Sequence, residues 1–316
     1  MMTHSPDRPL VLLDQVPRQP EFLSRLEKHV CLEIAGHVDS DHFLKYKKEP
    51  KVLVVRSPTR IQADALESLD GLEAVVVIGA GTDCVDEDAA RRMGIEVRGN
   101  PGVGAQSVAE FVIGMMVFLA RRFDEATRFI PENRAWSERA QLSHRELHGG
   151  TLGVIGLGEI GSRVGRMARS SFGMQVVAYD SRIRTPSASG HVRVLSSIDE
   201  LMRVSDTVTV HVPLTLQTHN MIGAEELEAC RDGAMLINTS RGGIVDEDAL
   251  VGVLRRGKVA SACVDVFEDE PPSRSSPLLS APNVVLTPHI GGLTQEADKR
   301  LHIAAADAVL ETLGLG

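Results

Sequence analysis

The sequence is poor in aromatic residues: its 316 residues include one Trp, two Tyr and eight Phe, which together make up 3% of the chain. A core built from this chain must therefore be mostly aliphatic, as it is in buried parallel strands rich in Val, Ile and Leu. Hydrophobic residues make up 43% of the chain and charged residues 24%. This is ordinary globular composition, with enough apolar material for packed domains.

Cysteines are few and scattered. The four are Cys31, Cys84, Cys230 and Cys263, and no two of them form a CxxC pair. This pattern favours reduced, mostly buried thiols and a cytoplasmic protein over a disulfide framework. The His, Cys and Asp residues show no clustering with metal-ligand spacing, so we expect no metal site.

The chain has no run rich in Lys and Arg, and its formal net charge is −9. Nucleic acid and anionic membranes need cationic contacts, so neither is expected as the main partner. The most apolar long stretch, Phe111–Ala120, is too short to span a bilayer, which takes about 20 residues. The segment Met1–Leu10 is polar and has no apolar core typical of a signal peptide. These features predict a soluble protein.

Short aliphatic runs alternate with helical patterns in two series along the chain. Such alternation predicts βαβ units and parallel sheets, and hence two α/β domains. The expected strands are Leu10–Leu13, Val52–Val55, Ala74–Ile78, Ile95–Val97, Thr151–Ile155, Gln175–Tyr179, Val192–Leu195, Thr207–Val210, Ala234–Asn238, Ala260–Val264 and Val284–Leu286. The expected helices include Glu21–Lys28, Ala63–Leu69, Glu87–Met93, Gln106–Arg122, Glu159–Phe172 and Thr294–Leu313. Ser187–Gly190 and Pro271–Ser276 are expected to be surface loops.

A glycine motif, G-x-G-x-x-G, lies at Gly156, Gly158 and Gly161. It follows a short aliphatic strand and opens a helical run, which is the context that a dinucleotide site requires. The first glycine permits a tight turn, the second lets the backbone approach a pyrophosphate, and the third allows the helix to pack closely on the strand. A bound anion would then face free N–H groups at the helix N-terminus.

The next expected strand ends in Asp180, about 20 residues after the glycines. A carboxylate there can accept hydrogen bonds from a ribose diol and would repel a 2′-phosphate. The sequence therefore favours NAD over NADP. Arg182 works against this preference, because its charge could offset that of the carboxylate.

Three later segments each place a polar residue after an expected strand: Arg241, Glu270 and His289. The carboxyl ends of parallel strands converge on the ligand crevice of an open sheet, so the three side chains could meet. Arg can bind a carboxylate in a bidentate manner. His is the best general acid near neutral pH, and a neighbouring carboxylate favours its charged form and fixes the ring. This set suits the reduction of a 2-keto acid.

These segments, together with the glycine motif, resemble the D-isomer-specific 2-hydroxyacid dehydrogenase family. The resemblance covers nearly the whole chain, and within the family it is closest to 3-phosphoglycerate dehydrogenases and hydroxypyruvate or glyoxylate reductases. It extends to Arg56-Ser57, Gly79–Asp83, Ser107–Glu110 and His211–Thr215.

The resemblance implies a role for each site residue. Arg241 would bind the carboxylate and carbonyl of the substrate, His289 would be the acid–base, and Glu270 would pair with His289. Further substrate contacts are implied at Arg56, Ser57 and the backbone N–H groups of Ala80 and Gly81. Cofactor contacts are implied at Gly156, Gly158, Glu159, Ile160, Gly161, Asp180, His211, Val212, Pro213, Thr218, Thr239, Ser240, Asp265 and Gly291.

The family fold has two Rossmann-like domains. It implies a flavodoxin-like substrate-binding domain of residues 1–100 and 291–316, and an NAD-binding domain of residues 101–290. Asn100–Gly104 and the region after His289 would be hinges, and closure could exclude water. The long helix at 106–122 usually packs across a two-fold axis in the family, which implies a homodimer.

The chain departs from the family at Gly104, where Asn is frequent, so a polar substrate contact is in doubt. Many phosphoglycerate dehydrogenases continue into a regulatory domain, so feedback control by serine is not expected here. Formate dehydrogenases have Gln at the place of Glu270, which argues against formate.

Several alternatives remain open at this point. Arg56-Ser57 favours a phosphorylated acid such as 3-phosphoglycerate as the substrate, although Arg56 could equally form an ordinary salt bridge. A hydroxypyruvate or glyoxylate reductase is the alternative enzyme. The alternative from another class is an NAD-sensing, corepressor-like binding protein, and a third is an NAD-bound scaffold without turnover.

Overall fold

In a computed structural model of the chain, residues 8–35, 49–56, 59–142, 144–183, 188–189 and 192–316 are described. The chain divides into two compact units. We call Met1–Gly104 together with Leu293–Gly316 unit 1, and Ala105–Gly292 unit 2.

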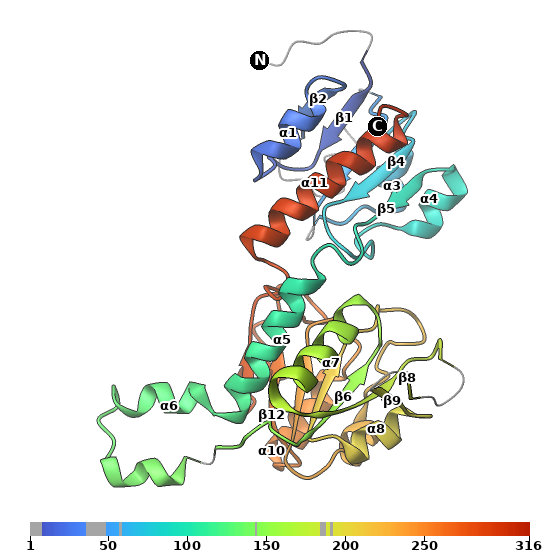
Figure 1. Cartoon of the computed structure of the whole chain (residues 1–316). Helices are drawn as coiled ribbons and strands as arrows, with labels where there is room; N and C mark the ends of the chain where they lie inside the picture. Colours follow the sequence, from blue (N-terminus) through green and yellow to red (C-terminus); the bar gives the residue numbers. More distant parts are fainter. Residues whose placement is uncertain (1–7, 36–48, 57–58, 143, 184–187, 190–191) are drawn as a thin grey trace. The chain divides into compact units, whose positions relative to one another are not determined.

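The centre of unit 1 is a five-stranded sheet with the order β2-β1-β3-β4-β5 (Figure 1). Every neighbouring pair in it is parallel. This order is that of the flavodoxin-like doubly wound fold, as predicted. The strands are β1 (Leu10–Leu13), β2 (Cys31–Ile34), β3 (Val52–Val55), β4 (Ala74–Val77) and β5 (Glu96–Arg98).

Helices cover both faces of this sheet. On one face, α3 (Ala63–Glu67) and α4 (Glu87–Met93) pack on side chains such as Leu12 and Leu53. On the other, α1 (Pro20–Leu26) and α11 (Gln295–Thr312) pack on the intervening strand residues, including Val11. Successive strand residues point to opposite faces, so strands covered on both faces must be aliphatic at every position, as β3 and β4 are.

Unit 2 holds an eight-stranded sheet with the order β13-β12-β11-β10-β6-β7-β9-β8. Its strands are parallel except for the antiparallel pair β8–β9. The direction of winding reverses between β6 and β10, which is the place where doubly wound sheets bind ligands. The strands are β6 (Thr151–Ile155), β7 (Gln175–Tyr179), β8 (Ala188–Ser189), β9 (Val192–Val194), β10 (Thr207–Val210), β11 (Ala234–Asn238), β12 (Val259–Val264) and β13 (Val284–Leu286).

Two helices, α5 (Ala105–Ala120) and α7 (Glu159–Phe172), pack on one face of the unit 2 sheet. The opposite face is covered by α8 (Ile198–Val204), α9 (Ala224–Ala229) and α10 (Glu247–Arg255). Unit 2 is therefore a three-layer sandwich, and the predicted fold class of two parallel-sheet α/β domains is confirmed. A short 3₁₀ helix, η2 (Pro277–Ser280), packs beside α10.

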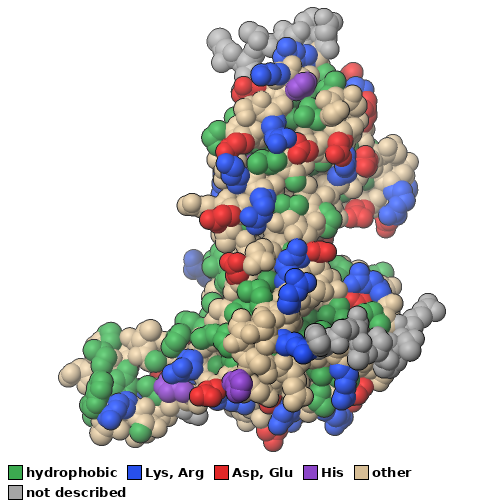
Figure 2. All heavy atoms as spheres, viewed as in Figure 1, with side chains coloured by type: hydrophobic (Ala, Val, Ile, Leu, Met, Phe, Trp, Pro, Cys, Tyr) green, Lys and Arg blue, Asp and Glu red, His purple; other side chains and the backbone are tan. Residues whose placement is uncertain are grey.

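A projecting segment follows α5 and carries α6 (Phe123–Phe129) and the 3₁₀ helix η1 (Trp136–Gln141). Figure 1 shows this segment extending away from the sheet of unit 2. Hydrophobic side chains gather on it in the space-filling view of Figure 2. Ile130 and Trp136 are each 66% exposed, which is unusual for side chains of this size.

Two local predictions differ from the structure. Ser187–Gly190 was expected to be a loop, but Ala188–Ser189 forms the edge strand β8, paired with β9. A strand of two residues is too short to give a pattern in the sequence. Strand β2 was not predicted. Only Leu32 of its four residues is buried, and the run Cys-Leu-Glu-Ile is not uniformly aliphatic.

Candidate active site

The glycine motif lies where the sheet order reverses, between the end of β6 and the start of α7. Gly156 has a φ of +96°, and a Cβ there would lie 2.5 Å from the carbonyl oxygen of His211. A Cβ on Gly161 would lie 2.0 Å from the carbonyl oxygen of Gly156, so no side chain fits. Both glycines are therefore required by the protein's own packing.

Gly158 is different, because a Cβ there would meet no atom within 4 Å. It is the N-cap of α7, and no side chain caps that helix end. The first N–H groups of a helix need an acceptor from outside the helix, and an anion such as a pyrophosphate can supply it. The open space above Gly158 and the uncapped helix end therefore fit a dinucleotide.

Asp180 follows β7 directly, and its side chain is only 5% exposed. Oδ2 accepts a hydrogen bond from the N–H of Leu157 in the glycine loop, at 2.9 Å. The backbone N–H, Nε and Nη2 of Arg182 donate the remaining three hydrogen bonds. The Arg182 side chain lowers the pKa of Asp180 to about 2, although burial opposes this, so the carboxylate is ionised near neutral pH.

The segment after β10 forms the other side of the reversal point. The surrounding protein desolvates the ring of His211 and lowers its pKa to about 3, so the ring is neutral near pH 7. Its Nε2 lies 2.9 Å from Oγ1 of Thr209. Further along, the hydroxyl of Thr218 donates to the carbonyl oxygen of Pro213 at 2.6 Å. Val212 follows His211 in the chain, and its Cγ1 would lie 2.9 Å from a Cβ placed on Gly156.

The loop after β11 carries Arg241. Asn238 fixes this loop: its Nδ2 donates to the carbonyl oxygen of Arg241 at 3.1 Å, and its Oδ1 accepts from the hydroxyl of Ser240 at 2.8 Å. Thr239 between them is buried, and its Oγ1 has no hydrogen-bond partner within the part of the chain that the structure describes. A buried hydroxyl without a partner is costly, so Thr239 fits a contact to a bound molecule.

His289 and Glu270 form a direct pair. Nδ1 of His289 lies 2.8 Å from Oε2 and 3.1 Å from Oε1 of Glu270. The two side chains are 38% and 29% exposed. Because Nδ1 faces the carboxylate, Nε2 is the ring nitrogen left to exchange a proton with a ligand. The pair therefore has the geometry of an oriented general acid–base.

Burial raises the pKa of Glu270, but the hydrogen bond from His289 and the charges of His289 and Arg241 outweigh it. The N–H of Phe267 adds a further hydrogen bond at 3.2 Å. The net pKa lies below the ordinary value of a glutamate. Glu270 is thus ionised near neutral pH, and its carboxylate fixes the orientation of the imidazole through Nδ1.

Asp265 shapes the loop that carries His289. The carboxylate is 1% exposed and accepts hydrogen bonds from Oγ1 of Thr287 at 2.6 Å and from the N–H groups of Ile290 and Gly291 at 2.9 and 2.8 Å. His289 itself has a φ of +53°, a left-handed conformation that is uncommon outside glycine and asparagine. Asp265 therefore stabilises the strained backbone that presents the imidazole.

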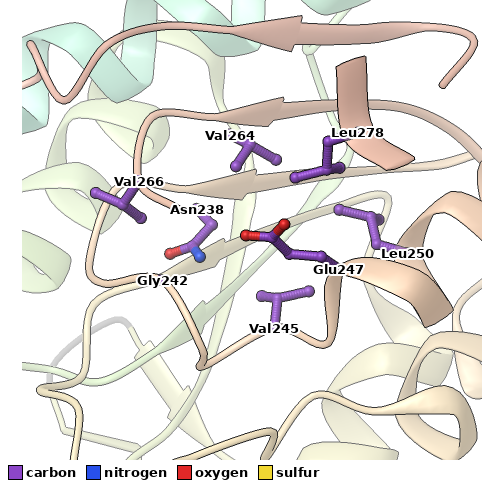
Figure 3. A pocket seen from close by; sticks show the side chains of 8 residues that line it. All are labelled: Asn238, Gly242, Val245, Glu247, Leu250, Val264, Val266 and Leu278. Atoms are coloured by element: carbon purple, nitrogen blue, oxygen red, sulfur yellow. The ribbon is translucent and has the colours of Figure 1, made fainter. Parts of the chain in front are cut away.

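Sequence reasoning missed some residues that support the site, among them Asn238, Thr287 and Glu247. Oε1 of Glu247 accepts a hydrogen bond from the N–H of Glu268 at 2.9 Å, and burial raises the pKa of Glu247. Figure 3 shows its carboxylate pointing into a small, mostly apolar pocket, whose lining includes Asn238 and Gly242. The three are neighbours of the motif residues in the sequence, but their contacts are not visible in it.

The remaining candidates for cofactor contacts, which lie in unit 2, contact neighbouring protein groups. Glu159 forms an ion pair with Arg163 one turn along α7, and Ile160 packs against the core under α5 and α7. Gly291 lies against Asp265, and a Cβ there would be 3.0 Å from its Oδ2.

The substrate candidates of unit 1 lie after the carboxyl ends of β3 and β4. Arg56 forms an ion pair with Asp298 of α11 at 2.8 Å, with both side chains nearly buried. Ala80 and Gly81 follow β4, and their N–H groups donate no backbone hydrogen bond to another described residue. Ser57 lies outside the described residues.

The described residues contain no group of three or more His, Cys, Asp and Glu side chains that is placed to hold a metal ion. Among the same residues, none of the helices combines the length and the apolar character needed to cross a membrane.

Unit 2 thus has an uncapped helix end that fits a dinucleotide and, in the same unit, an oriented acid–base pair. These two features define an NAD-dependent oxidoreductase. Comparisons with known proteins agree with this class. Residues 113–291 match the family model described as D-isomer specific 2-hydroxyacid dehydrogenase, NAD binding domain.

Individual relatives are similar over most of this chain. A hydroxypyruvate reductase from Thermotoga maritima is 40% identical over 302 residues, covering 95% of this chain and 97% of the relative. A D-3-phosphoglycerate dehydrogenase from Methanocaldococcus jannaschii is 37% identical over 298 residues, covering 94% of this chain. This chain matches only 56% of that longer relative.

Among solved structures, a D-lactate dehydrogenase from Aquifex aeolicus, complexed with NAD and lactic acid, has a TM-score of 0.85 and 29% identity. The similarity covers 97% of this chain and 96% of that one. The chain therefore belongs to the D-isomer-specific 2-hydroxyacid dehydrogenase family.

Proposed function

We propose that the chain catalyses reversible hydride transfer between NADH and C2 of a small 2-keto acid, giving the D-2-hydroxy acid. The observation that carries this proposal is the His289–Glu270 pair, held at 2.8 Å with the second ring nitrogen turned away from the carboxylate. When bound, NADH supplies the hydride. The residues of the chain supply a proton, an anchor for the substrate and a defined orientation.

Three side chains would share the chemistry. Arg241 binds the substrate carboxylate and polarises the keto group, as guanidinium groups do for planar anions. His289 donates a proton from Nε2 to the carbonyl oxygen during reduction and accepts it during oxidation. Glu270 stabilises the imidazolium and keeps Nδ1 in the protonated form.

The other site residues have proposed roles in binding. Unit 2 would be the NAD-binding domain, and unit 1 the substrate-binding domain. The N–H groups of Ala80 and Gly81 would hold the substrate carboxylate, supported by their lack of described backbone partners. The predicted cofactor contacts at the glycine loop and Thr239 are supported by the open space at Gly158 and by the unpartnered hydroxyl of Thr239. Asp180 would contact the ribose.

Two substrates are candidates within this reaction class. A hydroxypyruvate or glyoxylate reductase is supported by the nearly complete overlap with the Thermotoga relative. A phosphoglycerate dehydrogenase-like activity is supported by the position of Arg56 beyond β3, where it could contact a phosphate. The pairing of Arg56 with Asp298 favours the unphosphorylated acids, because Asp298 already neutralises the guanidinium.

The test is a substrate panel followed through NADH absorbance at 340 nm. We expect turnover of glyoxylate or hydroxypyruvate, with a higher kcat/KM than for phosphohydroxypyruvate or for bulkier 2-keto acids. A preference for phosphohydroxypyruvate would instead establish the phosphorylated substrate. If NADH binds but no acid in the panel is reduced, the proposed chemistry is wrong, and a cofactor-sensing role replaces it.

We also propose that the protein forms a homodimer through α5 and the projecting segment that carries α6 and η1. Ile113, Val117 and Phe118 of α5 are only partly buried. Ile130 and Trp136 of the projecting segment are both 66% exposed. Large apolar side chains that gather on one surface mark association sites, and a two-fold axis would bring two such surfaces together.

The double variant Ile130→Glu with Trp136→Glu is expected to sediment as a monomer at micromolar concentration, while the unaltered protein sediments as a dimer. Charge burial at the centre of an interface opposes association. Leu279→Glu is the matched control, because Leu279 is 51% exposed but lies on η2, which belongs neither to α5 nor to the projecting segment. A monomeric unaltered protein in analytical ultracentrifugation would rule out the proposed dimer.

A cytoplasmic location is part of the same proposal. The four cysteines are free thiols, and Cys230 and Cys263 are buried. Free thiols are typical of proteins in a reducing compartment.

A further inference from the structure

The carboxylate of Asp180 has no acceptor position left for a ligand. Oδ1 accepts the backbone N–H of Arg182 at 3.0 Å and its Nε at 2.9 Å. Oδ2 accepts the N–H of Leu157 at 2.9 Å and Nη2 of Arg182 at 2.7 Å. A carboxylate offers about four such positions, so all of them are in use.

A ribose diol can reach Asp180 only if one of these donors leaves. The N–H groups of Leu157 and Arg182 belong to the backbone of the two loops and cannot leave without moving them. The guanidinium of Arg182 can leave, because the Arg182 side chain is 75% exposed whereas that of Asp180 is 5% exposed. The ribose hydroxyl groups then replace the two hydrogen bonds that the guanidinium donates, so the cofactor binds in competition with Arg182.

The same arrangement has the opposite effect on a 2′-phosphate. Asp180 alone would repel a phosphate dianion, but here its charge is compensated by a guanidinium that bonds it through two nitrogens. A guanidinium is also a preferred partner of phosphate. Arg182 therefore weakens the binding of a ribose diol and strengthens the binding of a ribose 2′-phosphate.

We propose that Arg182 is a specificity-determining residue, which competes with the ribose hydroxyl groups for Asp180 and gives this chain measurable affinity for NADP(H). The inference rests on the proposed role of Asp180 in the cofactor site. It goes beyond that role because it assigns the discrimination between the two dinucleotides to the neighbouring arginine.

The test is the direct binding of NADH and NADPH, measured by isothermal titration calorimetry without substrate. In Arg182→Ala, we expect the Kd for NADH to fall about two- to fivefold, since the exposed competitor is gone. We expect the Kd for NADPH to rise at least about tenfold, because a charge-assisted contact is lost and Asp180 is left uncompensated. The preference for NADH over NADPH therefore rises in the variant.

Arg203→Ala is the matched control. Arg203 is 64% exposed and bonds Asp199 through Nε and Nη2, both at 3.0 Å, on the surface of α8. The substitution removes the same charge and the same kind of ion pair from unit 2. We expect the ratio of the two dissociation constants to stay at the value of the unaltered protein.

The outcomes separate this inference from the proposed function. If Arg182→Ala weakens NADH at least as much as NADPH, Arg182 only orders Asp180, and the inference is overturned. Unchanged Kd values for both dinucleotides would overturn it too. If the unaltered protein binds neither dinucleotide, the proposed cofactor site itself is wrong. Binding in the expected pattern without turnover of any keto acid would support the inference and contradict the proposed reaction.

Discussion

The variant His289→Ala is expected to lower kcat for the best keto acid at least about a hundredfold, the usual scale of general acid–base catalysis. The imidazole is the group oriented by Glu270 at 2.8 Å and presented by a left-handed backbone. The affinity for NADH is expected to stay within about twofold, because the glycine loop is built independently of His289. Steady-state kinetics and NADH calorimetry on the same preparation measure both quantities.

His144→Ala is the control for this variant. His144 is an exposed histidine of unit 2, whose Nδ1 lies 2.7 Å from the carbonyl oxygen of Arg121, and it has no proposed role. We expect its kcat to be unchanged. Turnover of His289→Ala within about threefold of the unaltered protein would remove His289 from the proton transfer, since general acid catalysis contributes far more.

Two alanine substitutions in the glycine motif are expected to impair different properties, NADH binding in one variant and stability in the other. Gly158→Ala places a methyl group in space that no protein atom occupies, so we expect the free energy of unfolding to change by less than about 0.5 kcal/mol. The methyl group would stand where a pyrophosphate must approach the backbone. We therefore expect the Kd for NADH to rise at least about tenfold, equal to about 1.4 kcal/mol.

Gly161→Ala is expected to damage the fold first, because its Cβ would lie 2.0 Å from the carbonyl oxygen of Gly156 and 2.9 Å from Cγ1 of Val154. The backbone of Gly156 would have to move to remove this clash, so we expect a loss of about 1–3 kcal/mol or more in unfolding free energy. Urea denaturation with NADH calorimetry separates the two variants. Tight NADH binding by Gly158→Ala would show that the dinucleotide does not approach this part of the loop.

Much of the fold was predictable because the sequence pattern of each strand or helix lies within that element itself. A parallel strand covered on both faces needs an aliphatic residue at nearly every position, so β3 and β4 stand out as short uninterrupted runs. Helix α7 was predicted with its observed bounds, since Gly158 precedes it and Gly173, at φ +62°, ends it. Strand β2 and the short β8 lacked this signal and were missed.

The candidate site was predictable only as a set of side chains at strand ends. The order of the strands explains why the residues after β11, β12 and β13 lie at one edge of the sheet. The sequence could not show which partners those residues take. The Arg182–Asp180 bonds, the Arg56–Asp298 pair and the contact of Glu247 with the Glu268 N–H depend on side-chain geometry, which no spacing rule supplies.

The place of α11 has a consequence for how the chain is made. Ala305, Ala306 and Val309 of this last helix belong to the same buried cluster as Val11 and Val52. During synthesis, the first strands therefore leave the ribosome long before the helix that covers their apolar face. Until residues 295–312 have been made, α1 is the one helix that packs on this face in the described part of unit 1, whereas the elements of unit 2 have by then all been synthesised. Synthesis of unit 1 thus begins before that of unit 2 and ends after it. The apolar face of the unit 1 sheet that α11 later covers is the surface on which a chaperone would act.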